Sequence, residues 1–200
     1  MARPKGTKKH GLKYLDEAEL KRFFQAVDKS KDKRDMFLFR LIFFLGLRVS
    51  EAAKLKMSDV NLDAFQISIT GLKNGRTRTY DLSARLFSKL ERWLKARNRK
   101  LRMENLYLFP SQRIFDEAIN PQQVKERFKK YAQQAGLSSD FSVHSLRHSC
   151  GILQAKKGST PIEIMSWLRH RNITSTQVYF EQIAFENQDK ETAQSFSEYL

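Results

Sequence analysis

The stretch from Met36 to Leu45 constrains the fold most strongly, because it is apolar on nearly every side. A helix of this kind has to be surrounded by other elements that cover it. Helical periodicity of apolar residues recurs before it, from Leu20 to Val27, and after it, from Leu86 to Leu94. The sequence therefore predicts a mainly helical domain packed around one central buried helix, which ends at Gly46.

The periodicity changes once, between Phe65 and Leu82, from helical to alternating. Ile67 and Ile69 alternate with polar residues, and Asn74-Gly75 is a strong signal for a tight turn. This region predicts a small antiparallel β-hairpin. The expected fold class is therefore mainly α with a small antiparallel β-hairpin or sheet (α+β).

Residues that commonly cap helices mark several further helix starts. Asp16 followed by Glu19 forms a capping-box pattern, and Pro121 suits the first turn of a helix that opens at Asn120. Three short helices are expected after it, from about 143 to 156, from 161 and from 174. Beyond 181 the periodicity is weak, so that end is expected to be only partly helical.

The formal net charge of +15 over 200 residues indicates a polyanionic partner. Nucleic acid is the leading candidate; an anionic membrane surface ranks below it, because the basic residues are spread along the chain and not gathered on one amphipathic helix. No stretch approaches the ~18 apolar residues of a membrane span. The single cysteine, Cys150, excludes an internal disulfide framework and a cysteine-rich zinc site, as expected for a cytoplasmic protein.

Two sets of basic residues are candidates for DNA contact. Residues 1–14 form a basic tail, expected to be flexible, in which Lys5, Lys8 and Lys9 could follow a DNA groove; a solubilising end is an equal alternative. The polar face of the helix predicted from 120 carries Lys125, Arg127, Lys129 and Lys130. This face is either plainly solvated or a surface that contacts phosphates.

The segment His144-Ser-Leu-Arg147 presents a histidine and an arginine one helical turn apart, and therefore on one helix face. A lone pair of this kind is more often a pair of solvated side chains than a functional site. Here the chain carries four further elements of different residue type, which are Arg48 within Gly-Leu-Arg-Val-Ser-Glu, Lys73 beside the hairpin tip, His170 and Tyr179. Their combination makes a chance match improbable.

In the order and approximate spacing of these elements, the chain resembles the tyrosine recombinases, the family of phage integrases and chromosome-dimer resolvases, over residues 15–180. The resemblance implies that family's catalytic-domain fold and a DNA cleavage that needs no metal, no cofactor and no ATP. Tyr179 would attack the scissile phosphate, giving a 3′-phosphotyrosyl link and a free 5′-hydroxyl. Its partners would be double-stranded DNA, further copies of the chain in a tetramer on DNA, and accessory DNA-bending proteins.

The resemblance also implies roles for the other residues of the set. Arg48 and Arg147 would clamp the nonbridging phosphate oxygens with their planar, permanently charged groups. Lys73 would be the general acid that protonates the leaving 5′-oxygen. His144 and His170 would hold the phosphate and assist proton transfer at the tyrosine.

Four nearby residues have supporting or structural interpretations. Glu51, one helical turn after Arg48, would either orient its guanidinium or form an ordinary surface pair. His148 is expected to point away from the site, and Cys150 to be buried and inert. Arg169 stands where the family usually has a glycine, so we expect either that it is modestly strained in a left-handed helix end or that the local turn differs.

The chain departs from most of that family before residue 15, where no N-terminal core-binding domain is expected. In this respect and in segments such as His144-Ser-Leu-Arg-His-Ser-Cys-Gly, it is similar to the short recombinases that invert fimbrial promoter switches. Residues 181–200 are expected to dock on a neighbouring protomer. Three functions stay open, namely a recombinase for inversion, integration or excision, a type IB topoisomerase-like enzyme, and a non-catalytic DNA-binding regulator on the same fold.

Overall fold

The computed structural model of the chain describes residues 11–71, 77–100, 105–111 and 117–197. The elements in these ranges are α1 (Glu17–Lys29), α2 (Lys33–Phe44), α3 (Val49–Ala53), a 3-10 turn η1 (Met57–Asp59), β1 (Val60–Asn61), β2 (Gln66–Thr70), β3 (Thr77–Asp81), α4 (Ala84–Lys100), α5 (Pro121–Gln134), α6 (Val143–Lys156), α7 (Pro161–Leu168) and α8 (Thr174–Ser197). Every helix in these ranges is too short or too polar to span a membrane.

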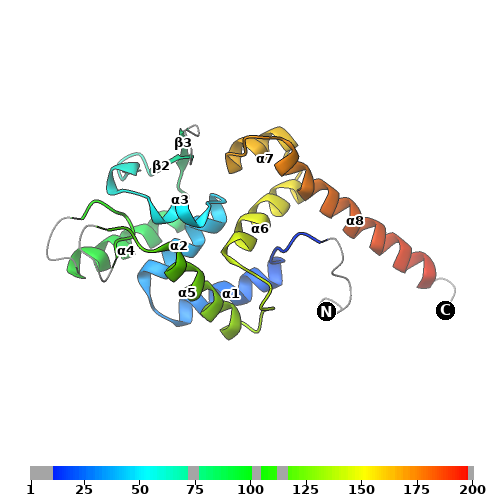
Figure 1. Cartoon of the computed structure of the whole chain (residues 1–200), viewed down its shortest axis with the longest axis horizontal. Coiled ribbons are helices and arrows are strands. Elements are labelled where there is room, and N and C mark those ends of the chain that lie inside the picture. Colours follow the sequence, from blue (N-terminus) through cyan, green and yellow to red (C-terminus); the bar gives the residue numbers. More distant parts are fainter. Residues whose placement is uncertain (1–10, 72–76, 101–104, 112–116, 198–200) are drawn as a thin grey trace.

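Helix α2 lies at the centre of the larger hydrophobic core, as predicted (Figure 1). The Asp32 side chain caps its start by accepting hydrogen bonds from the backbone N–H groups of Arg34 and Asp35. Helices α1, α4 and α6 pack against it. Its buried apolar residues are Phe37, Leu38, Phe39, Leu41 and Ile42. Gly46, with φ +55°, turns the chain after the helix into the segment that leads to α3.

Aromatic rings join α1 and α5 to the central helix. The centroid of the Phe23 ring lies 5.5 Å from that of Phe39 and 4.9 Å from that of Phe128. The Tyr131 ring packs edge-on against Phe39, and its hydroxyl donates to the buried carboxylate of Asp35 over 2.7 Å. Burial of these large rings is the main stabilising contribution in this part of the fold.

The alternating segment forms the predicted hairpin, in which Ile67 of β2 pairs with Tyr80 of β3. Ile67 and Ile69 are both buried, as their alternation predicts. The two-residue strand β1 adds a third antiparallel strand that the sequence did not indicate. The hairpin tip, with Lys73 and the turn signal Asn74-Gly75, lies outside the described residues.

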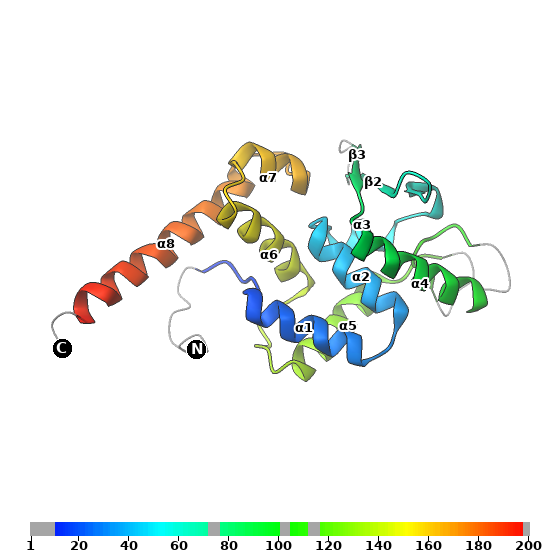
Figure 2. The same cartoon turned by 180° about the vertical axis from the view of Figure 1, so that it is seen from behind.

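A second, smaller core joins α6, α7 and α8, and its buried residues are Tyr14, Cys150, Ile152, Ile164, Leu168 and Tyr179. Both views of the molecule show α8 starting at this core and then projecting away from the rest of the chain (Figures 1 and 2). The expectation of a short helix from 174 and partial helix beyond 181 is wrong, because one helix runs continuously to Ser197. Packing of Tyr179 and Ile183 in the smaller core, and the hydrogen bonds of Gln182 and Glu186 with the segment before α1, continue the helix past residue 181.

The segment before α1 lies beside α8. The backbone N–H of Leu12 donates to the Gln182 side chain over 2.9 Å, and the Tyr14 hydroxyl donates to Glu186. Glu186 also pairs with Lys156 of α6 at 2.9 Å. The first half of α8 is therefore fastened to α6 and to the start of the described chain.

Candidate active site

Arg147 lies in the middle of α6, with only 1% of its side chain exposed. Its guanidinium donates to the carbonyl oxygen of Leu168 over 2.6 Å and to that of Gly46, at the ends of α7 and α2. Carbonyl groups at helix C-termini lack partners within the helix, so a cation satisfies them well. Burial, and then the neighbouring Arg48, lower the pKa of Arg147 to about 10, and the side chain is still a cation at neutral pH.

Arg48 and Glu51 stand at the start of α3. The Arg48 guanidinium donates to Glu51 Oε1 over 2.8 Å, and the Arg48 backbone N–H donates to Oε2 over 2.8 Å. The Glu51 side chain is fully buried and also lies 3.1 Å from Arg169 and 3.8 Å from Arg147. Burial opposes ionisation, but Arg169, Arg48 and Arg147 together hold the pKa of Glu51 below its usual value. Glu51 is therefore a buried carboxylate shared by three guanidinium groups, and not a surface pair.

Tyr179, on α8, is almost completely buried, with 1% of the residue exposed. Its ring packs on α6 at Gly151, where an added Cβ would lie 2.5 Å from the ring, so only glycine permits this approach. Its hydroxyl oxygen lies 3.4 Å from Nδ1 of His148. Burial raises the pKa of Tyr179 to about 12, although Arg147 opposes the shift. The phenol is therefore protonated at neutral pH and needs a base before it can act as a nucleophile.

The structure corrects the expectation that His148 points away from the site. The centroid of its ring lies 4.4 Å from that of His144 and 5.9 Å from that of Tyr179. The reason is that α8 crosses α6 beside Gly151, and His144, His148 and Gly151 share one helix face. The spacing of the two histidines in the sequence indicated this shared face. The angle between His148 and Arg147 around the helix led to the wrong expectation, because it takes no account of where α8 crosses. Burial, and then His144 and Arg147, lower the pKa of His148 to about 3.

His170 follows α7, and its ring stacks on that of Tyr179 with 6.1 Å between centroids. Its Nδ1 lies 2.8 Å from the hydroxyl of the buried Thr176, which orients the imidazole. Burial, and then the charges of Arg147 and Arg48, lower the pKa of His170 to about 3. The imidazole is therefore neutral at neutral pH and can accept a proton or a hydrogen bond.

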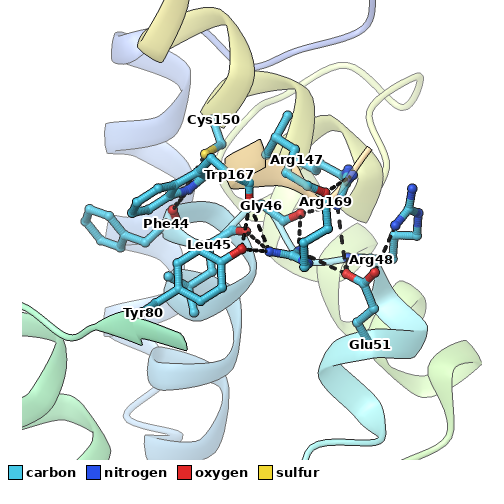
Figure 3. A network of polar contacts seen from close by, with 11 residues as sticks. Phe44, Leu45, Gly46, Arg48, Glu51, Tyr80, Arg147, Cys150, Trp167 and Arg169 are labelled. Atoms are coloured by element: carbon cyan, nitrogen blue, oxygen red, sulfur yellow. Dashed lines mark hydrogen bonds and ion pairs between the residues drawn. The ribbon is translucent and has the colours of Figure 1, made fainter. Parts of the chain in front are cut away.

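Arg169 has the left-handed backbone predicted for it, with φ +56° and ψ +40°. Sequence reasoning gave it no other role. In the structure its guanidinium is buried and connects the end of α2, the end of α7 and the carboxylate of Glu51 (Figure 3). A charged residue in a position that favours glycine was the only signal in the sequence for this contact.

The basic residues predicted on the polar face of α5 divide into two groups. Lys125 and Lys129 are exposed, as a surface that contacts phosphates requires. Arg127, expected on the same face, instead pairs with Asp32 and Asp35, because α5 packs beside the turn between α1 and α2. The other lysines expected to act in catalysis or DNA contact, which are Lys5, Lys8, Lys9 and Lys73, lie outside the described residues.

Two neutral imidazoles thus lie beside the phenol of Tyr179, and the charges of Arg48 and Arg147 both act on it. Guanidinium forks match the oxygens of a phosphate, and a neutral imidazole can take the phenol proton. The arrangement can bind a phosphodiester and activate the tyrosine for attack. In the part of the chain that the structure describes, no three His, Cys, Asp or Glu side chains gather closely enough to hold a metal ion.

The chain belongs to the phage integrase family, whose family model matches residues 13–184. Among its relatives, the tyrosine recombinase XerA of Pyrococcus horikoshii is 33% identical over 168 residues, which cover 84% of this chain and 56% of that protein. The type 1 fimbriae regulatory protein FimB of Escherichia coli K12 is 32% identical over 167 residues, which cover 83% of this chain and 82% of that protein. The chain therefore spans little more than half the length of the Pyrococcus relative.

Solved structures of recombinases have the same fold. A crystal structure of XerA recombinase matches with a TM-score of 0.75 at 27% identity, covering 85% of this chain and 60% of that chain. The XerH site-specific recombinase, bound to palindromic difH substrate in a post-cleavage complex, matches with a TM-score of 0.76 at 28% identity, covering 92% of this chain and 53% of that chain. The predicted tyrosine-recombinase catalytic-domain fold, mainly helical with a small antiparallel sheet, is confirmed.

Proposed function

We propose that this chain is a site-specific recombinase that cuts and rejoins double-stranded DNA with Tyr179 as its nucleophile. The observation that carries the proposal is the environment of the Tyr179 hydroxyl. That hydroxyl lies 3.4 Å from a neutral imidazole, that of His148, and in the field of Arg48 and Arg147. A phenol buried for packing alone would not need two arginines and two histidines beside it.

In the proposed cleavage, the Tyr179 oxygen bonds to phosphorus and its proton passes to a neutral imidazole. We assign the acceptor role to His148, because its Nδ1 is the nitrogen within reach of the hydroxyl. The bond from phosphorus to the 5′-oxygen breaks, and that oxygen takes a proton from Lys73, the general acid that the family resemblance implies. The 3′-phosphotyrosyl link keeps the energy of the phosphodiester, so a 5′-hydroxyl of a second strand can reverse the step without ATP.

The two arginines would stabilise the charge that builds on the nonbridging oxygens. Arg147 is held by carbonyl groups at the ends of two helices, so its position is set before DNA binds. The Arg48 side chain is 37% exposed. Its guanidinium has five N–H donors, and those that do not bond to Glu51 can donate to a phosphate. His144 is exposed in the first turn of α6, one turn before Arg147, and would contribute to holding the phosphate.

The net charge of +15 supports DNA as the partner. Lys125, Lys129 and the lysines of the basic tail are the residues we expect to contact phosphates. The logarithm of the affinity should fall with the logarithm of the salt concentration, by about 0.9 per phosphate neutralised. We expect the reaction to take place in the cytoplasm, with accessory DNA-bending proteins.

We also propose that residues 181–200 dock on a neighbouring protomer in a tetramer on DNA. Helix α8 continues beyond the smaller core to Ser197 (Figure 2), and we propose this extension as the part that a neighbouring copy contacts. Deletion of residues 188–200, which leaves the contacts of Gln182 and Glu186 in place, should abolish strand exchange between two sites while reducing binding to one site far less. Strand exchange that survives the deletion would contradict the docking role.

Covalent trapping tests the proposed activity. The protein and its Tyr179→Phe variant are incubated, without added metal, with nicked suicide duplexes taken from the DNA around its gene, and adducts are separated on a denaturing gel. An adduct with the wild-type protein that is absent with the variant is the expected result. Tight, salt-sensitive binding with no adduct on any duplex would instead favour a DNA-binding regulator.

A further inference from the structure

The backbone of Arg169 has the left-handed conformation that glycine adopts most easily, at the last turn of α7. A side chain in this conformation is strained, so other contacts have to hold the backbone there. The contacts come from the guanidinium, which is 5% exposed. Its partners within hydrogen-bond distance, seen in Figure 3, are the carbonyl oxygens of Leu45, Gly46 and Trp167, the Tyr80 hydroxyl, and Oε2 of Glu51.

These partners come from two helix ends that meet at this point. Leu45 and Gly46 follow α2, and Trp167 lies in the last turn of α7. The carbonyl groups at helix C-termini carry partial negative charge and lack partners within the helix. A buried guanidinium with five donors in a planar fork satisfies several of them at once. Arg169 therefore joins the two helix ends, much as Arg147 does through Gly46 and Leu168.

Arg169 and Arg147 share acceptors. Gly46 O accepts from both guanidinium groups, at 3.3 Å from that of Arg169. The two oxygens of Glu51 have different partners. Oε1 accepts from the Arg48 guanidinium at 2.8 Å, whereas Oε2 accepts from the Arg48 backbone N–H at 2.8 Å and from Arg169 at 3.1 Å, with Arg147 at 3.8 Å. With Arg169 removed, Oε2 would draw Arg147 away from the helix-end carbonyls that hold it.

We propose that Arg169 is a positioning residue for strand cleavage, which holds the Glu51 carboxylate so that Arg48 and Arg147 keep the separation that a phosphate requires. The inference rests on the proposed function and deepens it, because it concerns how the two phosphate-binding arginines are held. Tyr80 extends the network to the sheet, since its hydroxyl accepts from Arg169 and donates to Trp167 O over 2.6 Å. The position of β3 is thereby coupled to the positions of Arg48 and Arg147.

The chain contains a matched control for the backbone strain. Lys31, in the exposed turn before α2, has φ +56° like Arg169 and is also a cation in a left-handed position. Lys31→Gly therefore relieves the same strain and removes the same charge without touching the network. Arg169→Gly also relieves the strain and removes a charge, but in addition it removes the guanidinium that forms the network.

The test compares the two glycine variants in single-turnover cleavage of a nicked suicide duplex at saturating protein. Arg169→Gly should cleave about a hundredfold more slowly, the loss expected for a misplacement of about 1 Å in a reacting group, with little change in DNA affinity. Low-millimolar guanidinium ion, below denaturing levels, should restore part of the rate. Lys31→Gly should cleave and bind like the wild-type protein. A wild-type rate for Arg169→Gly, or a loss of binding as large as the loss of cleavage, would overturn the positioning role.

A second readout does not depend on activity. The side-chain Nε–H resonance of Arg147 in nitrogen-15 spectra should shift in Arg169→Gly, and to a lesser degree in Tyr80→Phe, which keeps the ring and deletes only the hydroxyl. An Arg147 resonance unchanged in both variants would overturn the inference even if cleavage were slow. A wild-type protein that forms no adduct, but whose Arg147 resonance moves as expected, would count against the proposed function alone.

Discussion

The two cores of this molecule differ in how many charged side chains are buried beside them. The larger core around α2 is aliphatic and aromatic, with rings such as Phe23, Phe39 and Phe128 in mutual contact. Beside the smaller core beneath α8, the side chains of Arg147, Arg169 and Glu51 are buried as a network of charges, whereas the larger core has the buried carboxylate of Asp35, paired with Arg127, at its edge. Burying apolar groups stabilises a fold directly, whereas burying charged groups does so only when every group is paired. The comparison indicates that stability resides mainly in the first core and chemistry in the second.

The largest effect should come from the larger core. Phe128→Ala removes a fully buried ring and should lower the free energy of unfolding by about 3–5 kcal/mol, measured by urea denaturation. The cleavage rate per folded molecule should hardly change, because the ring does not contact the smaller core. A variant that stays folded but cleaves slowly would show that the two cores are not separable.

A replacement at Arg147 should have the opposite effect, with a large loss of cleavage rate and a smaller loss of stability. Arg147→Lys keeps the charge but loses the fork that joins Leu168 O to Gly46 O. Single-turnover cleavage should slow by about a hundredfold or more, while the free energy of unfolding changes less than in Phe128→Ala. Cleavage at the wild-type rate would mean that a charge alone suffices at this position.

Gly151→Ala tests the fit of α8 on α6. The added Cβ would lie 2.5 Å from the Tyr179 ring, so α8 has to shift. We expect destabilisation by about 1–3 kcal/mol from overpacking, and slower adduct formation because the phenol moves away from His148. If adduct formation and thermal stability both match the wild-type protein, the close packing of Tyr179 on α6 is refuted.

The smallest effect concerns pH. The pKa of His148 and that of His170 are both lowered to about 3, so the unfolded chain binds more protons than the native one below the ordinary histidine pKa. This contribution to stability is present above about pH 6.5 and is lost as the pH falls toward about 3. When the pH is lowered from about 7 to about 5, the free energy of unfolding should therefore fall less in His170→Gln than in the wild-type protein. Equal losses in both proteins would contradict the lowered pKa.

The fold could be predicted largely from periodicity. The run from Met36 to Leu45 required a covered central helix, and the alternation at Ile67 and Ile69 indicated the hairpin. Both depend on local sequence alone. The length of α8 could not be predicted, because residues 181–200 show only weak periodicity and the contacts of Gln182 and Glu186 come from distant parts of the chain.

The candidate site could be predicted only where residue type and order carry the information. Tyr179, Arg48 and Arg147 were identified as candidates from a pattern along the chain, without knowledge of what surrounds them. His148 and Arg169 were not, because their contacts depend on where α8 crosses α6 and on two helix ends that meet from opposite halves of the chain. Angles within one helix cannot supply that information.

The carbonyl groups that hold Arg147 belong to Gly46 and Leu168, which are far apart in the sequence, and Tyr179 lies later in the chain than both. Contacts so distant in sequence form late, after the loop-closure entropy has been overcome. During synthesis, the larger core can begin to assemble while α8 is still in the ribosome. A nascent chain would thus have no competent nucleophile until α8 has left the ribosome and packed on α6.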